Sequence, residues 1–272
     1  MKIIVNIIKV FILAVATISS CSLYANESAR EAQTEWQQAL DAYSAKEYDE
    51  AKAAFEKVQA MGYASADLYY NLGNVYFKLG QQHAERPYAN GELGRAILNY
   101  RRALKLDPTM EDARYNLDIA HDHTNDAEAM PLGVMGSMWS ALRGVMTANG
   151  WVWTSLVSLV VALVMMMLYL LSTIVALRKT AFFVSIAMLA IFVLSTALAI
   201  SQRRVFKQST DAVILCNDVT SVHASPDNVS KVIRQPSQGV SVQILRTFGD
   251  WTEIEFVDGE KGWIPSKSVE RV

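Results

Sequence analysis

Apolar residues in this chain occur in blocks with different spacings, and each block predicts a different kind of structure. Between residues 26 and 129, apolar positions recur every three or four residues, which is typical of amphipathic helices. The runs 151–177 and 181–201 contain no charged residue. From residue 211 onward, apolar and polar residues alternate, which indicates β-strands with one buried face. The pattern therefore predicts a multidomain chain with an all-α part, two apolar helices and a small all-β domain.

The first 25 residues have the layout of a secretory signal peptide. The segment begins with Lys2 and Lys9, continues with a short apolar run over residues 10–18 and ends in small residues. Residues 18–21 resemble a bacterial lipobox, in which Cys21 would be lipidated and become the mature N-terminus. The competing cleavage site follows Ala25. Both alternatives predict export of the segment that follows.

The two apolar runs are each long enough to cross a bilayer. A helix rises about 1.5 Å per residue, so some 20 residues span a hydrocarbon core of roughly 30 Å. Only the region of Arg178 and Lys179 separates the runs, and backbone polar groups cannot be left without partners in lipid. We therefore expect an antiparallel transmembrane hairpin, with helices over 151–177 and 181–201. Residues 130–150 predict an interfacial linker helix before it.

The signal and the hairpin together predict a topology. If the signal exports residues 26–150, the turn of the hairpin lies in the cytoplasm and the C-terminal domain returns to the outer face. Arg203, Arg204 and Lys207 outnumber the two basic residues of the turn, which leaves an inverted topology as the alternative. The expected location is the inner membrane, with both soluble parts periplasmic.

The helical part repeats a pattern of paired helices. Residues 69–80 predict a first helix, with the small Gly73 at a helix crossing and Gly80 at its end. Residues 95–108 predict a second helix, closed by a proline, and 48–58 match the second helix of an earlier pair. These segments resemble tetratricopeptide repeats, which implies an array of helix pairs that binds other proteins.

Two further segments complete the repeat array. Residues 112–120 predict a polar capping helix, and residues 81–91 form an insertion between the paired helices. The insertion is either a recognition element or a tolerated surface loop. By its position in the repeat family, the protein-binding groove would be lined by Tyr70, Asn71, Asn74, Phe77, Tyr115 and Asn116.

Residues 211–272 predict a small β-barrel. Short hairpins must close or pack to hide their apolar face, and about 60 residues suit five strands. Residues 249–251 and 262–265 resemble the bacterial SH3 family, whose members bind cell-wall peptides or proteins. The resemblance implies a ligand face at Trp251 and Trp263, because aromatic grooves hold extended peptides at little ordering cost. Trp263 has the alternative role of locking the barrel.

Composition argues against several other classes of function. A formal net charge of −2 provides no concentrated basic surface for nucleic acid. Cys21 and Cys216 lie far apart, and the four histidines lack ligand spacing, so we expect neither a disulfide framework nor a metal site. Carboxylates, histidines and nucleophiles form no recognisable catalytic constellation. We therefore expect no enzyme activity and no cofactor.

The order of the parts resembles one family as a whole. A signal, tetratricopeptide repeats with a cap at 112–117, a hairpin preceded by tryptophans and a C-terminal SH3 domain resemble the BatE family of the Bacteroides aerotolerance (Bat) operon. The resemblance implies a scaffold that works beside von Willebrand A-type Bat proteins and a MoxR-type ATPase in envelope stress tolerance. The alternative is a peptidoglycan-binding or wall-sensing anchor that acts through its SH3 domain.

Overall fold

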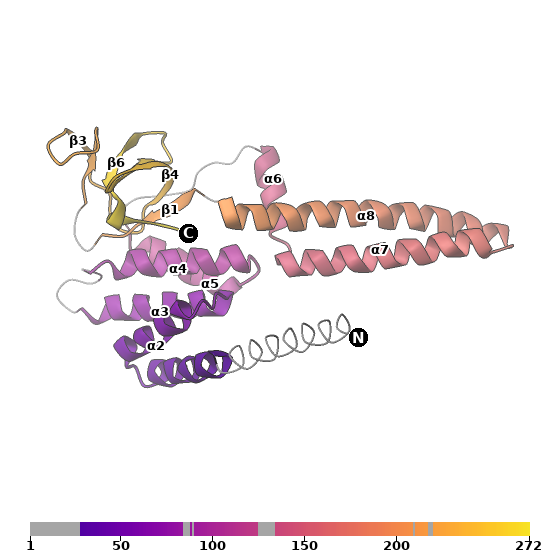
Figure 1. The fold of residues 1–272 in the computed structure, drawn as a ribbon, viewed down its shortest axis with the longest axis horizontal. Coiled ribbons are helices and arrows are strands. Elements are labelled where there is room, and N and C mark those ends of the chain that lie inside the picture. Colours follow the sequence, from indigo (N-terminus) through magenta and orange to yellow (C-terminus); the bar gives the residue numbers. More distant parts are fainter. Residues whose placement is uncertain (1–27, 84–87, 89, 125–133, 209, 217–219) are drawn as a thin grey trace, which may run out of the picture. The chain divides into compact units, whose positions relative to one another are not determined.

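The computed structural model contains helices, a long helical hairpin and a small β domain, in that order along the chain (Figure 1). The signal segment and Cys21 lie outside the described residues. The chain divides into two compact units, residues 1–64 and 65–272, which are described separately. The structure describes residues 28–83, 88, 90–124, 134–208, 210–216 and 220–272, with the backbone alone at 134–137, 140 and 205–208.

The first unit contains one pair of helices. Its described part begins with a helix over residues 28–44, followed by α2 (Tyr48–Ala60). The rings of Trp36 and Phe55 meet edge to face, with centroids 5.3 Å apart, and Phe55 is fully buried. Ala51 is also fully buried, as expected of a small residue between closely packed helices. The predicted helix pair is therefore present in this unit.

The second unit begins with three helices, α3 (Ala66–Gln82), α4 (Glu92–Leu106) and α5 (Glu111–Asp122). A Cβ atom added to Gly73 would lie 2.5 Å from Cε1 of the Tyr100 ring. Only a residue without a side chain fits there, so Gly73 marks the crossing of α3 and α4, as predicted.

Two helix boundaries differ from the prediction. Helix α3 does not end at Gly80 but continues to Gln82. Gly80 is needed for packing instead, because a Cβ atom there would lie 2.1 Å from the Tyr88 ring. Helix α4 begins at Glu92, three residues earlier than predicted, directly after Gly91, whose φ of 78° suits glycine.

The hairpin consists of α7 (Ala148–Leu171) and α8 (Val175–Gln208), and α6 (Val134–Arg143) precedes it. The prediction that the helices are joined at Arg178 and Lys179 is wrong, because both residues lie within α8. The break falls at 172–174, where the hydroxyl oxygen of Ser172 accepts a hydrogen bond from the backbone N–H of Ile174 at 3.2 Å. Serine competes for backbone hydrogen bonds and breaks helices, whereas arginine and lysine extend them.

Both hairpin helices are long and apolar enough to cross a membrane. Most of their large apolar side chains are exposed, including Leu170 and Phe183. A core helix in a water-soluble domain would bury such side chains, so their exposure favours contact with lipid. Between the helices, the Ser185 hydroxyl donates a hydrogen bond to the backbone oxygen of Ala162 at 3.2 Å, which is a typical contact in membrane helix pairs.

The β domain is an antiparallel sheet with the strand order β3-β2-β6-β5-β4-β1-β7 in the part of the chain that the structure describes. The predicted count of five strands is too low, because β2 and β3 have two and three residues and cannot display a period of two. The strands are β1 (Asp211–Ile214), β2 (Val222–His223), β3 (Val232–Arg234), β4 (Ser241–Phe248), β5 (Trp251–Glu255), β6 (Lys261–Pro265) and β7 (Val269–Arg271), with the short 3₁₀ helix η1 (Ser266–Ser268) before β7.

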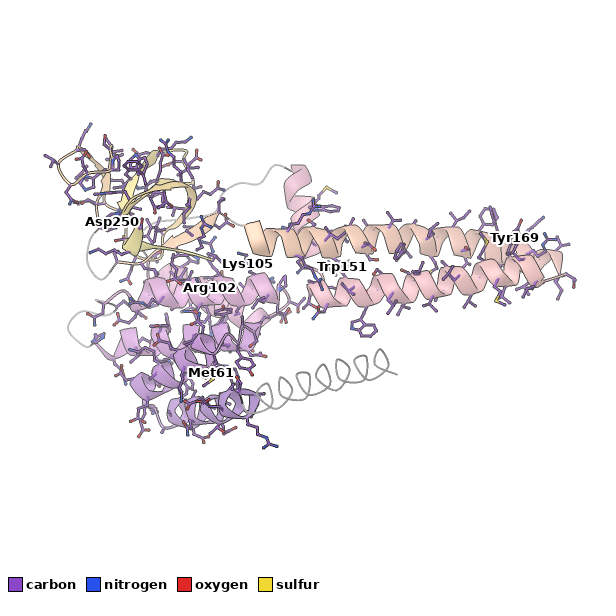
Figure 2. All side chains as sticks on the ribbon, viewed as in Figure 1. Met61, Arg102, Lys105, Trp151, Tyr169 and Asp250 are labelled. Atoms are coloured by element: carbon purple, nitrogen blue, oxygen red, sulfur yellow. The ribbon has the colours of Figure 1, made fainter. Side chains whose placement is uncertain are left out.

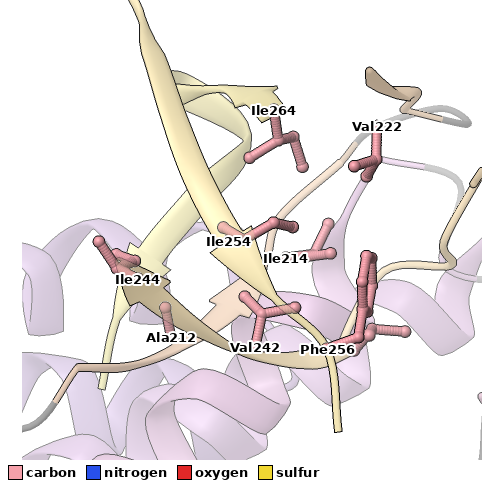
Figure 3. Close-up of a cluster of buried hydrophobic side chains, with 9 residues drawn as sticks. Ala212, Ile214, Val222, Val242, Ile244, Ile254, Phe256 and Ile264 are labelled. Carbon is pink, nitrogen blue, oxygen red and sulfur yellow. The ribbon is translucent and has the colours of Figure 1, made fainter. Parts of the chain in front are cut away.

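The alternating residues predicted for β4 and β5 form the core of this domain. Val242, Ile244, Ile254 and Phe256 are all buried, and they lie together with Ile264 of β6 (Figure 3). The small β domain predicted from the alternation is confirmed, and its apolar face is hidden inside the curved sheet.

We expect Gly73→Ala to destabilise the repeat, because the added methyl group meets the buried ring of Tyr100. Overpacking of this kind costs roughly 1–3 kcal/mol. Thermal unfolding of the full chain in detergent, followed by the helical circular dichroism signal, measures the loss.

The matched background for this test is Tyr100→Leu, in which the ring is removed. There Gly73→Ala should be neutral or stabilising, because alanine is the better helix former by about 1 kcal/mol. An equal loss of stability in both backgrounds would show that Gly73 is not required by the helix crossing.

Candidate interaction surfaces

The polar residues predicted for the groove join α3 to α5. The side-chain amide of Asn116 donates a hydrogen bond to Oδ1 of Asn74 at 2.8 Å, and the Tyr100 hydroxyl donates to the same oxygen at 2.9 Å. Asn71 lies one turn before Asn74 and donates to the backbone oxygen of Asp67 at 2.9 Å. Asn74 and Asn116 are therefore brought together, but their hydrogen bonds hold the repeat helices to one another.

The predicted groove aromatics divide into packed and exposed rings. The Phe77 ring lies 5.6 Å from the ring of Tyr88 and 5.6 Å from that of His123, measured between centroids. The Tyr70 ring lies 6.3 Å from that of Tyr100. Tyr115 on α5 is 67% exposed and is the groove residue most accessible to a partner. The protein-binding role of this face remains a prediction.

The other side of α4 packs against the β domain, a contact that the sequence did not predict. A Cβ atom on Gly94 would lie 3.0 Å from the backbone oxygen of Ile214, and one on Gly239 would lie 2.5 Å from Cδ1 of Ile97. Val213 of β1 is fully buried in the same apolar cluster as Ile97. The two glycines allow the helix and the sheet to approach at the level of their backbones.

Hydrogen bonds of Gln238 connect the insertion between α3 and α4 to the β domain. Its side-chain amide donates to the backbone oxygen of Tyr88 at 2.6 Å, and its Oε1 accepts from the backbone N–H of Gly94 at 3.2 Å. Tyr88 belongs to the insertion 81–91, which the sequence left as either a recognition element or a surface loop. Its described part contacts the chain's own β domain.

Charged residues of α4 hold the C-terminal strand. Arg102 and Lys105 both lie on α4 (Figure 2). Arg102 donates to the carboxylate of Glu270 at 2.7 Å, and Lys105 donates to the backbone oxygen of Val272 at 2.5 Å. Burial lowers the pKa of Lys105, and the carboxylate of Asp211 on β1 partly offsets that effect. The last residues of the chain are thereby fixed to the repeat array.

The start of α4 is fixed by a buried carboxylate. Glu92 Oε2 accepts from the backbone N–H of Asn90 at 2.9 Å, and Oε1 lies 3.0 Å from Nε2 of His83. Burial alone would raise the pKa of Glu92, but the hydrogen bonds that it accepts outweigh burial and lower that pKa. Among the described residues, no three His, Cys, Asp or Glu side chains are grouped to hold a metal ion.

The predicted ligand residues of the β domain share one outer face. Trp263 of β6 pairs directly with Glu253 of β5 and with His223 of β2. Trp251 lies two residues from Glu253 on the same strand, so its side chain projects to the same side. Its ring meets that of His223 edge to face, with centroids 5.5 Å apart.

The two tryptophans differ in accessibility. Trp263 is only 8% exposed, because the guanidinium of Arg246 lies 5.3 Å from its ring and is itself paired with Glu253 at 2.6 Å. Trp251 is half-buried, and its cross-strand neighbour Phe248 is 68% exposed. This arrangement favours a locking role for Trp263 and leaves Trp251 and Phe248 as the accessible aromatic pair.

Sequence reasoning missed the residues that join the two domains. The available signals were the isolated Gly94 inside a helix and the Gln238–Gly239 turn, since an interior helical glycine often marks a close approach. Neither signal shows which segment packs against it, because about 145 residues separate Gly94 from Gly239 in the chain and a local pattern cannot identify so distant a contact.

Comparison with protein families identifies the helical part and the β domain as two different kinds of domain. A model of the tetratricopeptide repeat matches residues 66–90, and a second model of the repeat matches residues 86–121. A model of the bacterial SH3 domain matches residues 218–270. No curated protein and no solved structure matches the chain. The chain therefore contains tetratricopeptide repeats and a C-terminal bacterial SH3 domain, separated by two apolar helices that could span a membrane.

We expect Gly239→Ala to loosen the β domain from α4. The change strains a left-handed backbone, at φ 88°, and places a methyl group against Ile97. Hydrogen exchange of the amides in the N-terminal half of α4 and in β1 measures the effect, which should be a loss of protection of roughly five- to 150-fold for a clash of about 1–3 kcal/mol.

Gly249→Ala is the matched control. Gly249 is also left-handed, at φ 56°, but nothing lies within 4 Å of an added Cβ atom. This variant should strain the backbone locally without a side-chain clash, and the hydrogen-exchange protection of the α4 amides should stay unchanged. If both variants expose α4 equally, the contact at Gly239 does not hold the two domains together.

Proposed function

We propose that this protein is a non-enzymatic scaffold, anchored in the inner membrane, that holds partner proteins together at the outer face. The observation that supports it is the contact through Gly94, Gln238 and Gly239, which uses one side of α4. The face with Tyr115 and the face with Trp251 take no part in that contact. The repeats suggest protein–protein interaction, so the face with Tyr115 would bind a protein. The SH3 domain suggests a cell-wall-binding module, so the face with Trp251 would bind wall material or a second protein.

The scaffold acts by raising effective concentration. Two binding faces in one compact unit hold their partners beside each other, so contact between the two bound partners becomes intramolecular, with effective concentrations in the millimolar range for short connections. A weak contact between the partners is then enough to keep both of them on the scaffold. Removing either face should abolish joint retention while leaving single-partner binding weak.

We further propose that both soluble parts are periplasmic and that the partners are von Willebrand A-type Bat proteins. An extracytoplasmic location suits a bacterial SH3 domain. The two apolar helices found among the described residues, α7 and α8, would together return the chain to the side from which it entered. The order of repeats, hairpin and SH3 domain supports the assignment to a Bat-type aerotolerance or envelope stress complex.

Site-specific photocrosslinking in cells tests the scaffold. A photoreactive residue at Tyr115 should capture one envelope protein, and the same residue at Trp251 should capture a second protein or wall material. The controls are Thr109 and Glu260, which are exposed positions in turns of the repeat array and the β domain. Adducts that form equally from all four positions, or from none, would refute the two-face scaffold.

The accessible pair of the half-buried Trp251 and the exposed Phe248 favours one second function, a peptidoglycan-binding anchor. In that case Trp251→Ala should reduce sedimentation of the full chain with purified wall sacculi by about tenfold or more, as for loss of an aromatic hot spot. Val229→Ala, at a fully solvated loop position of the same domain, should leave it unchanged. Undiminished sedimentation of the Trp251 variant excludes this face as the wall-binding site.

A further inference from the structure

The closed end of the hairpin contains a cavity of about 550 Å³. It is formed by the end of α7 and the first turns of α8. Tyr169 lies at that end of the hairpin, far along α7 from Trp151 (Figure 2). The lining residues are Tyr169, Val175, Arg178, Lys179, Phe182 and Phe183.

Two cations line this cavity without a carboxylate to balance them. Arg178 and Lys179 are both exposed, and no ion pair joins either of them to another described residue. The sequence contains no Asp or Glu between Glu128 and Asp211. Asp211 follows the far end of α8, more than about 40 Å away at 1.5 Å per helical residue. Within the described part of the chain no carboxylate supplies the counter-charge, so the two cations are available to an anion from outside it.

The aromatic residues hold the arginine in place. The guanidinium carbon of Arg178 lies 5.3 Å from the centroid of the Tyr169 ring, and the ring of Phe182 lies 5.5 Å from the same ring. Stacking on the face of a guanidinium leaves its N–H edge available to donate, and that edge matches two oxygens of a phosphate. Phe183 continues the apolar wall beside Phe182, with centroids 5.6 Å apart.

With α8 crossing a membrane, as the proposed function requires, the cavity would lie at the depth of lipid headgroups. The charge-free part of α8 begins at Thr180, directly after the two cations, and runs for spanning length to Ser201. Aromatic rings and basic residues at the end of such a run are placed at the interface between hydrocarbon and water. A phosphate ester with acyl chains matches both the cationic and the apolar parts of the lining.

We propose that this cavity binds the phosphate of an anionic phospholipid, with Arg178 and Lys179 on the phosphate and Phe182 and Phe183 beside the acyl chains. The inference rests on the membrane anchoring in the proposed function. It adds a specific lipid to that anchor: basic pockets between membrane helices bind acidic headgroups, and each cation near the surface favours an anionic leaflet. A bound lipid would fix the depth of the hairpin and select the leaflet in which its closed end lies.

Native mass spectrometry of the full chain in nanodiscs tests the proposal. The nanodiscs contain equal amounts of phosphatidylcholine and phosphatidylglycerol, and the measured quantity is the ratio of the two lipids retained on the released protein. The wild type should retain phosphatidylglycerol preferentially. Arg178→Gln with Lys179→Gln should reduce that preference by about 25-fold, from roughly fivefold for each cation. Tyr169→Leu should reduce it by about two- to fivefold through loss of stacking.

Arg203→Gln with Arg204→Gln is the matched control, since these adjacent arginines are exposed at the opposite end of α8. It removes the same charge and should lower the lipid ratio much less than the double variant at Arg178 and Lys179, because general attraction by surface cations lacks the aromatic lining of the cavity. An equal loss in both double variants, or no preference in the wild type, overturns the proposal. So does thermal stabilisation in neutral detergent by inorganic phosphate as great as that by phosphatidylglycerol, which would indicate a site for free anions.

Failure of this site and failure of the anchor are distinguishable. A chain that is not recovered with membranes on cell fractionation refutes the anchor itself. A chain recovered with membranes that shows no lipid preference refutes only the lipid site. No protein partner or wall material is present in the nanodiscs, so the result is independent of the two binding faces.

Discussion

The backbone-level contact between α4 and the SH3 domain is the constraint on which the arrangement of the second unit depends. Gly94 and Gly239 allow the approach, Gln238 bridges the insertion to the start of α4, and Arg102 and Lys105 hold the C-terminal strand. Apolar burial, hydrogen bonds and charge pairing act on one short helix. The two domains are therefore parts of one compact unit, whereas two modules on a flexible linker would move independently.

This contact decides which surfaces are open to partners. The SH3 domain covers one side of α4, which leaves the predicted groove face of α3 and α5 uncovered by that contact. On that face the internal hydrogen bonds of Asn74 and Asn116 stabilise the helices, and the exposed ring of Tyr115 is the principal accessible feature. On the SH3 domain, Arg246 lies over the ring of Trp263 and is paired with Glu253, so Trp263 is covered by the domain's own side chains. Trp251 and Phe248 remain accessible.

The hairpin depends on a different physical constraint, the environment of its outer surface. Its apolar side chains project outward, and the helices share few polar contacts, such as that between Ser185 and Ala162. Outside lipid, such a surface would associate or aggregate. Ser172, rather than the basic pair, makes the turn, so Arg178 and Lys179 are retained on α8 beside Tyr169.

The sequence by itself determined the classes of element and their order, because helical, charge-free and alternating patterns reflect local burial over a few residues. The helix crossing at Gly73 and the core of Val242, Ile254 and Phe256 follow from such patterns. Strands of two and three residues were not predicted, because so few residues cannot show the alternation of apolar and polar positions that indicates a strand.

Only the tertiary structure decided which of the candidate binding residues serve packing. Asn74 and Trp263 resemble ligand-binding residues in the sequence, but their neighbours in space are internal partners. The contact of Gly94 with the strand ending at Ile214, and the insertion's role in it, were likewise beyond sequence reasoning. A glycine indicates that something approaches closely, but what approaches is set by the folding of segments more than a hundred residues away.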